Sequence, residues 1–167
     1  MLKPVKTATL RVKGGNFAIV ASKYNARYVD AMLRAAVAEL KRAGAKVQVV
    51  RVPGAFEIPA VAATLAQANS VHATPHTPHI SAIICLGVIF QGQTSHAQHI
   101  GWGVTHALAQ IQVFHKLPVI HGVFVFEQEE HAKVRCLDRK HNRGREAART
   151  ALEMARVMMG LNPSAQA

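Results

Sequence analysis

The sequence predicts an α/β fold, a three-layer sandwich in which a four-stranded parallel sheet carries helices on both faces. Short apolar runs alternate along the chain with longer segments whose apolar residues recur at helical spacing. Such an alternation makes successive strands parallel, and a parallel sheet needs cover on both faces. The chain has 167 residues, of which 50% are hydrophobic, so one domain with a sizeable core is expected.

The first half of the chain contains two strand-and-helix units. Residues 17–22 form a short apolar run after two glycines, which predicts a strand. Between Val29 and Leu40 the apolar residues follow helical spacing, and Gly44 ends that helix. The alternating residues 46–52 then predict the second strand.

The second of these strands is followed by a helix and a polar segment. Residues 57–67 predict a helix, with Pro59 tolerated in its first turn. Residues 68–79 are polar and contain two prolines and three histidines, so we expect an extended loop there. The apolar residues 80–86 predict the third strand.

The last part of the chain repeats the pattern. Ser95 precedes a helix that Leu117 and Pro118 end, and residues 119–126 predict the fourth strand. The charged residues 127–135 predict a short helix. A long closing helix, marked by apolar residues between Ala148 and Met159, is expected to end near Gly160.

The charge of the chain favours anionic ligands. Lys and Arg number 20 against nine Asp and Glu, which gives a formal net charge of +11. The cationic run 135–145 is a candidate nucleic-acid patch, but Asp138 interrupts it and it has no aromatic residue for stacking bases. We therefore expect no nucleic-acid partner.

The compartment is predicted from the cysteines and the apolar runs. Cys85 and Cys136 are far apart and form no CxxC motif, so both are expected to be packing residues in a reducing compartment. The N-terminus has no apolar core typical of a secretory signal. The apolar run 80–90 is far shorter than the ~20 residues that span a bilayer. We expect a cytoplasmic protein with no membrane partner.

Residues suited to chemistry follow every predicted strand. They are residues 23–25 after the first strand, 53–57 after the second, 87–96 after the third and 127–135 after the fourth. Because open parallel sheets bind ligands beyond the carboxyl ends of their strands, these four loops predict one shared site.

The loop after the third strand is a candidate anion site. Residues 92–95 offer backbone N–H groups, a hydroxyl and the positive end of the following helix, which suit a phosphate but are equally typical of a simple N-cap. His96 begins that helix, where its imidazole could move protons at neutral pH.

Other side chains near the strand ends have two interpretations each. Tyr24 and Phe56 could offer flat faces to a heterocycle, although an aromatic residue beside a strand end is more often part of the core. Glu57 stands at a predicted helix start, where a carboxylate is favourable to the helix dipole whether or not it also binds a ligand. Three histidines in the polar segment could bind a metal, but no fixed frame holds them, so we expect a solvated loop and no metal site; they are His72, His76 and His79.

Taken together, these segments resemble the 6,7-dimethyl-8-ribityllumazine synthase family, over about residues 17–161. The strongest piece is VPGAFEIP at 52–59, which reproduces the family's central motif. IVASKYN resembles the family's first loop, GVIFQGQTSH its Gly-rich phosphate loop, and RCLDRKHNRGREAARTALEMA its C-terminal segment. The resemblance implies that the sandwich is flavodoxin-like.

The resemblance also implies roles for individual residues. Tyr24 matches the aromatic residue that stacks on the pyrimidine substrate, where most members have Phe, and His96 matches the proton donor. Arg135 matches the phosphate-binding arginine, which in the family reaches in from the neighbouring subunit. The other matching positions hold the ribityl chain (Ala55, Phe56, Glu57), read the pyrimidine ring through the backbone (Val88, Ile89, Phe90) and receive the phosphate (Gln93, Thr94).

The chain departs from the family's pattern at several positions. Gln91 stands where an arginine is usual, and Gln98 where an acidic residue is usual. The loss of that acidic group removes a usual support of the imidazole, since a carboxylate near imidazole raises its pKa. His121 stands in a substrate-binding position that is usually Phe, and His141 replaces a frequent Gly or Ala.

The activity implied is the condensation of 5-amino-6-(D-ribitylamino)uracil with 3,4-dihydroxy-2-butanone 4-phosphate to 6,7-dimethyl-8-ribityllumazine. This reaction is the penultimate step of riboflavin biosynthesis, and it needs neither a cofactor nor a metal. The alternative is a divergent paralogue with low activity that binds a flavin or lumazine, which the departures at Gln91, Gln98 and His121 motivate.

The resemblance further implies an assembly. We expect residues 16–161 to form the single domain, residues 1–15 to lie along a neighbouring subunit, and residues 162–167 to be a short tail. The smallest active unit is expected to be a homopentamer. Residues 135–146 show no insertion relative to capsid-forming members, so a 60-subunit icosahedral shell is expected.

Overall fold

A computed structural model describes residues 14–71 and 79–161, and its four strands form one parallel sheet. The strand order is β2-β1-β3-β4. The strands are β1 (Asn16–Ser22), β2 (Lys46–Val52), β3 (Ile80–Phe90) and β4 (Val119–Phe126). The helices are α1 (Ala26–Arg42), α2 (Ile58–Val71), α3 (His96–His115), α4 (Glu129–Ala132), the π-helical turn η1 (Lys133–Leu137) and α5 (Arg143–Leu161). The predicted α/β class is confirmed.

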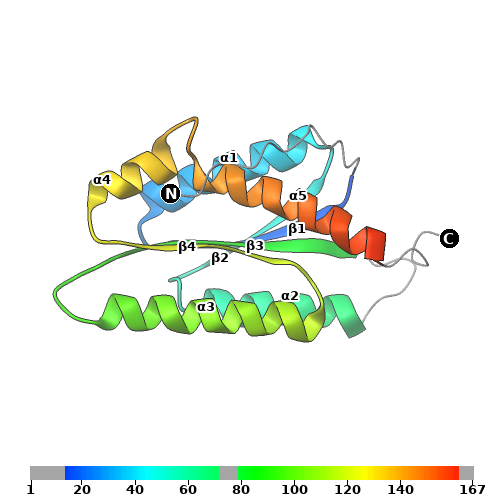
Figure 1. Cartoon of the computed structure of the whole chain (residues 1–167), viewed down its shortest axis with the longest axis horizontal. Coiled ribbons are helices and arrows are strands. Elements are labelled where there is room, and N and C mark those ends of the chain that lie inside the picture. Colours follow the sequence, from blue (N-terminus) through cyan, green and yellow to red (C-terminus); the bar gives the residue numbers. More distant parts are fainter. Residues whose placement is uncertain (1–13, 72–78, 162–167) are drawn as a thin grey trace.

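The helices cover both faces of the sheet, as Figure 1 shows. Helices α1, α4 and α5 lie on one face, and α2 and α3 lie on the other. Side chains of β1 alternate between the two layers: Ile19 belongs to the core under α1 and α5, and Val20 to the core under α2 and α3. Because β1 and β3 are buried on both faces, their sequences are mostly apolar along their whole length.

Strand β3 is longer than the sequence predicts. Residues 87–90, expected to begin the loop after the third strand, continue that strand and pair with β4 as far as Phe90↔Phe126. A Cβ on Gly87 would stand 3.3 Å from both Ile58 Cδ1 and Val123 Cγ1. This glycine therefore allows close packing under α2 rather than interrupting the strand.

Helix α2 also extends further than predicted. Residues 68–71, expected to begin the polar loop, are its last turn. Asn69 stabilises this end because its Oδ1 accepts the N–H of Ile80 at 2.6 Å and its Nδ2 donates to the Ile80 carbonyl at 3.2 Å. His72 and His76 lie outside the described residues, whereas His79 is exposed and its Nε2 lies 3.3 Å from Asn69 Nδ2.

The segment after β4 is not the single short helix predicted for residues 127–135. It forms α4 and then the π-helical turn η1. Tyr28 on α1 anchors this segment by donating its hydroxyl to Glu129, and its ring packs edge-on against Phe90 with ring centroids 5.5 Å apart. Asn142 then caps α5 by accepting the N–H of Gly144 at 2.9 Å.

Both cysteines are buried and free within the domain, as predicted. Burial raises the pKa of the Cys136 thiol to about 11 and raises that of Cys85 well above its usual range. The thiols therefore stay protonated near neutral pH. Among the described residues no helix is long and apolar enough to cross a membrane. The N-terminal segment and the tail expected at 162–167 fall almost entirely outside the described residues.

Candidate functional site

The loops after β1 and β2 are bound to one another at the carboxyl edge of the sheet. The backbone N–H of Lys23 lies 2.8 Å from the Val52 carbonyl oxygen, and that of Tyr24 lies 3.1 Å from the Pro53 carbonyl oxygen. Asn25 Nδ2 donates to the Val88 carbonyl at 2.8 Å, which connects the first loop to β3. Two of the four loops predicted to converge are thus held together by hydrogen bonds, and the first of them is also bonded to the end of β3.

Two aromatic side chains are displayed at this edge. Tyr24 is 70% exposed and Phe56 is 60% exposed, so neither belongs to the core, which was the more common expectation for aromatic residues beside strand ends. The Tyr24 ring packs over Gly54, where an added Cβ would stand 3.1 Å from its Cδ2. The Phe56 ring lies over α3, 3.6 Å from where a Cβ on Gly103 would be. Both rings can therefore offer flat faces to a ligand.

Glu57 shapes the second loop rather than standing free. Its Oε2 accepts the backbone N–H of Gly54 at 2.8 Å. A Cβ on Gly54 would lie 2.8 Å from the same oxygen, so Glu57 and Tyr24 both pack against this glycine. The exposed remainder of the carboxylate faces solvent just before α2 begins, whereas Ala55 is buried.

The end of β3 offers backbone groups to a ligand. Pairing with β1 ends at Ala21↔Leu86, while pairing with β4 continues to Phe90↔Phe126. The side chain of Val88 is buried, and Ile89 and Phe90 pack against the two cores, so these residues can face a ligand mainly through their backbone. Beyond Leu86 their polar groups on the β1 side need partners other than a strand, and Asn25 supplies one of them.

The loop between β3 and α3 is exposed and ends in His96. Residues 92–95 are all exposed, and Thr94 Oγ1 lies 3.4 Å from the backbone nitrogen of His96. His96 is the first residue of α3, as predicted, and its ring is exposed. The loop thus presents backbone donors and a hydroxyl at the N-terminus of a 20-residue helix, which favours an anion.

Arg135 lies in η1, which follows β4 and α4 in the sequence and packs against α1. It is half-buried, and within residues 14–71 and 79–161 no carboxylate pairs with it. By contrast, Arg143 pairs with Glu146, and Arg145 lies 3.9 Å from Glu39. The guanidinium of Arg135 therefore keeps its donors available for an external anion.

His121 lies on β4, earlier along the strand than the residues opposite the end of β3. It is paired with Cys85, whereas Val88 and Phe90 are paired with Phe124 and Phe126 further along β4. Its Nε2 lies 2.9 Å from Thr105 Oγ1, and desolvation beside α3 lowers its pKa. His121 thus stands on the edge strand, several residues before the carboxyl edge where the loops converge.

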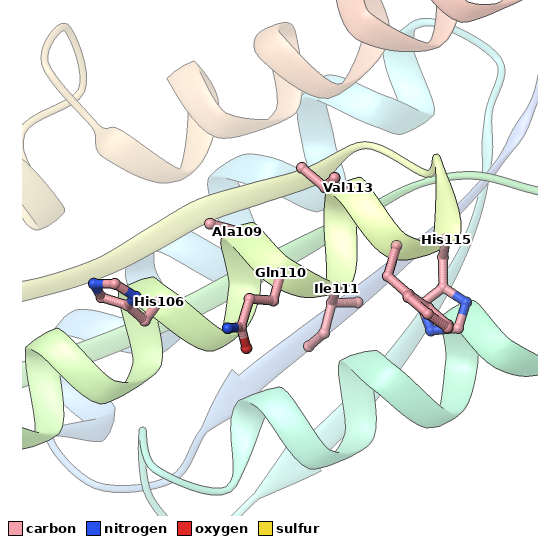
Figure 2. A pocket seen from close by; sticks show the side chains of 7 residues that line it. His106, Ala109, Gln110, Ile111, Val113 and His115 are labelled. Carbon is pink, nitrogen blue, oxygen red and sulfur yellow. The ribbon is translucent and has the colours of Figure 1, made fainter.

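A hollow on the outer surface of α3 is distinct from the candidate site. Figure 2 shows its lining side chains along α3, including His106, Gln110 and Val113. The same helix exposes Trp102 (72%) and Phe114 (82%), which are large apolar side chains. An apolar helix surface of this kind is typical of a contact with another protein surface.

Sequence reasoning missed two residues that organise the site. Asn25 was noted only as part of a loop, and Gln91 only as a departure, yet the structure places both in hydrogen bonds to loop backbone. Asn25 has a left-handed backbone, with φ of 55°, a conformation that Asn adopts more readily than most residues. Among the described residues no cluster of His, Cys, Asp or Glu could hold a metal ion.

The fold and these loops define an α/β protein with a ligand site at the carboxyl edge of its sheet. The model of the family described as 6,7-dimethyl-8-ribityllumazine synthase matches residues 14–159. The chain is 37% identical to a 6,7-dimethyl-8-ribityllumazine synthase of Stenotrophomonas maltophilia over 149 residues, which cover 87% of this chain and 90% of that protein. It is 39% identical to one of Xylella fastidiosa over 152 residues, 89% of this chain and 93% of that protein. The chain belongs to the 6,7-dimethyl-8-ribityllumazine synthase family.

Proposed function

We propose that this chain is a transferase that condenses 5-amino-6-(D-ribitylamino)uracil with 3,4-dihydroxy-2-butanone 4-phosphate to 6,7-dimethyl-8-ribityllumazine. The reaction is the penultimate step of riboflavin biosynthesis. The observation that carries this proposal is the family match across residues 14–159, which includes every loop of the candidate site.

The reaction is balanced without an oxidant or a reductant. The 5-amino group attacks the ketone, an imine forms with loss of water, and inorganic phosphate leaves the butanone carbon chain. Ring closure then releases a second water. What the protein must supply is a fixed geometry for two reactants and a route for protons.

The exposed aromatic rings and the end of β3 are proposed to hold the pyrimidine. Tyr24 stacks on the heterocycle, and the backbone of Val88, Ile89 and Phe90 reads its polar edge. The loop formed by Ala55, Phe56 and Glu57 holds the ribityl chain. Support comes from the exposure of the Tyr24 and Phe56 side chains. It also comes from β3, whose pairing with β1 ends at Leu86 and leaves the backbone beyond it without that strand partner.

The phosphate is proposed to bind at Gln93 and Thr94, with His96 as the proton donor. Bound there, the butanone phosphate would have its reacting carbons near the imidazole at the start of α3. Most of the rate acceleration then comes from positioning the reactants, with proton transfer by His96 as a smaller contribution.

Arg135 and His121 are proposed to serve the site of a neighbouring subunit. Support comes from the position of His121 on β4, the edge strand of the sheet, and from Arg135, which among the described residues has no carboxylate partner of its own. Arg135 would contact the neighbour's phosphate, and His121 would lie against the neighbour's pyrimidine. A site completed in this way requires an oligomer.

The assembly proposed is a homopentamer, with twelve pentamers closing into a 60-subunit shell. The apolar outer surface of α3 supports a contact between copies (Figure 2). Residues 1–15 are proposed to lie along the adjacent subunit. Light scattering tests the assembly: a mass of five or sixty subunits is expected, and a fully active monomer or dimer would contradict it.

Turnover tests the activity. The purified protein is mixed with both substrates, and the fluorescence of the lumazine product is followed together with release of inorganic phosphate. We expect equal amounts of the two products. Tight lumazine or flavin binding without turnover would contradict the proposal and would favour the binding paralogue.

A further inference from the structure

We propose that Gln91 is a positioning residue that gives the phosphate loop its anion-binding shape; this inference rests on the proposed function. Gln91 is the first residue after β3, and its backbone nitrogen lies 2.8 Å from the Phe126 carbonyl oxygen. Its side-chain Nε2 lies 3.1 Å from the Gly92 carbonyl oxygen and 2.7 Å from the Thr94 carbonyl oxygen. One amide group therefore holds two carbonyls of the following loop.

The orientation of this amide is fixed by its partners. Carbonyl oxygens only accept hydrogen bonds, so the group that faces both of them must be the NH₂ and not the Oε1. The Oε1 is buried, and within the described part of the chain it has no hydrogen-bond partner. A buried acceptor without a partner is unfavourable, so the side chain adopts this pose because of the loop carbonyls it holds.

The two held carbonyls determine where the loop's donors point. In a trans peptide the C=O and the following N–H point in opposite directions, and the described residues contain no cis peptide. With the Gly92 carbonyl turned toward Gln91, the N–H of Gln93 points away from it. The same holds for Ser95, whose N–H is opposite the Thr94 carbonyl.

The result is a pair of backbone N–H groups, at Gln93 and Ser95, that point away from Gln91 at the start of α3. Residues 92–95 are exposed, so packing against the rest of the protein does not fix the direction of these N–H groups. Thr94 adds its hydroxyl, which can accept from the His96 N–H at 3.4 Å and leave its own proton free for an anion. Gln91 thus organises the donors without touching the phosphate.

This role predicts a defect confined to one substrate. Replacing Gln91 by Met keeps the length of the side chain but removes the two donors, and Gln91→Glu removes them while keeping the shape. Each lost hydrogen bond releases one loop carbonyl. We therefore expect both variants to raise the KM for the butanone phosphate on the order of tenfold. The KM for the pyrimidine and the kcat at saturating substrates should stay within about twofold of wild type.

The matched control is Gln67→Met, the same substitution at an exposed position near the far end of α2. It should leave all three constants unchanged. If the two Gln91 variants behave like this control, or if they lower kcat and alter both KM values together, the inference is wrong.

Amide hydrogen exchange separates a failure of this inference from a failure of the proposed function. Inorganic phosphate should slow exchange at Gln93 and Ser95 in the wild-type protein and should not do so in the Gln91 variants. If the wild type makes no lumazine, the proposed function fails, and the exchange experiment still decides the role of Gln91. Equal phosphate protection in wild type and variants would overturn it.

Discussion

The proposed proton-transfer role of His96 can be tested directly with one substitution. It begins α3 beside the loop of residues 92–95, and its ring is open to solvent. We expect His96→Ala to lower kcat on the order of 10²-fold, near the low end for general acid–base groups because positioning dominates. Steady-state turnover at saturating substrates measures this. His99→Ala, one turn further along α3, is the control, and an unchanged kcat in His96→Ala would assign that residue a structural role only.

Loss of the Arg135 side chain is expected to change the KM for one substrate only. A charge-assisted hydrogen bond contributes about 1.5 to 3 kcal/mol, so Arg135→Ala should raise the KM for the butanone phosphate by roughly 10- to 150-fold. The KM for the pyrimidine should change little. Arg156→Ala is the control, since Arg156 is exposed on α5. Equal effects of Arg135→Ala on both substrates, or no effect on either, would remove Arg135 from the phosphate site.

At the scale of elements, the α1–α5 contact depends on one glycine. A Cβ on Gly144 would overlap the backbone carbonyl of Met32 on α1. Because backbone cannot yield as a flexible side chain does, Gly144→Ala should destabilise the protein by about 1–3 kcal/mol. Gly160→Ala, on the same helix with no neighbour within 4 Å, should be neutral or slightly stabilising. Urea unfolding of both variants measures the difference, and equal stability would contradict this account of the packing.

The sequence predicts the elements better than it predicts their ends. Period and apolar runs give the order of strands and helices, because burial on one or two faces sets those patterns directly. The predicted end of β3 was wrong because residues 87–90 are held in the strand by pairing with β4, which lies far away in the sequence. The end of α2 was wrong because Asn69 is paired with Ile80 across the polar segment.

The candidate site was predictable in part for the same reason. The loops that carry it follow strand ends, so Tyr24, Glu57 and His96 could be selected from position alone. The exposure of Tyr24 and Phe56 could not, since an aromatic residue at a strand end has the same local sequence whether buried or displayed. The contacts of Gln91 with the Gly92 and Thr94 carbonyls depend on the orientation of its side chain, which the spacing of residues in the sequence does not predict.

At the scale of the whole molecule, the central proposal is a site shared between two subunits. Tyr24 follows β1, Thr94 and His96 follow β3, and Arg135 lies in η1 after β4. If Arg135 serves the neighbouring subunit, each active site contains loops of one copy and the guanidinium of the next. Two variants that are each defective at every site can then restore one another in a mixed oligomer.

Turnover of mixed oligomers is the most direct test of a lumazine synthase site shared between subunits. His96→Ala and Arg135→Ala subunits are co-refolded in equal amounts and assayed at low butanone phosphate, beside each variant refolded alone. Random mixing places an intact His96 opposite an intact Arg135 at about one quarter of the sites, so roughly a quarter of wild-type activity is expected. Activity equal to the mean of the two separate variants would contradict the account, because both groups would then act within one subunit.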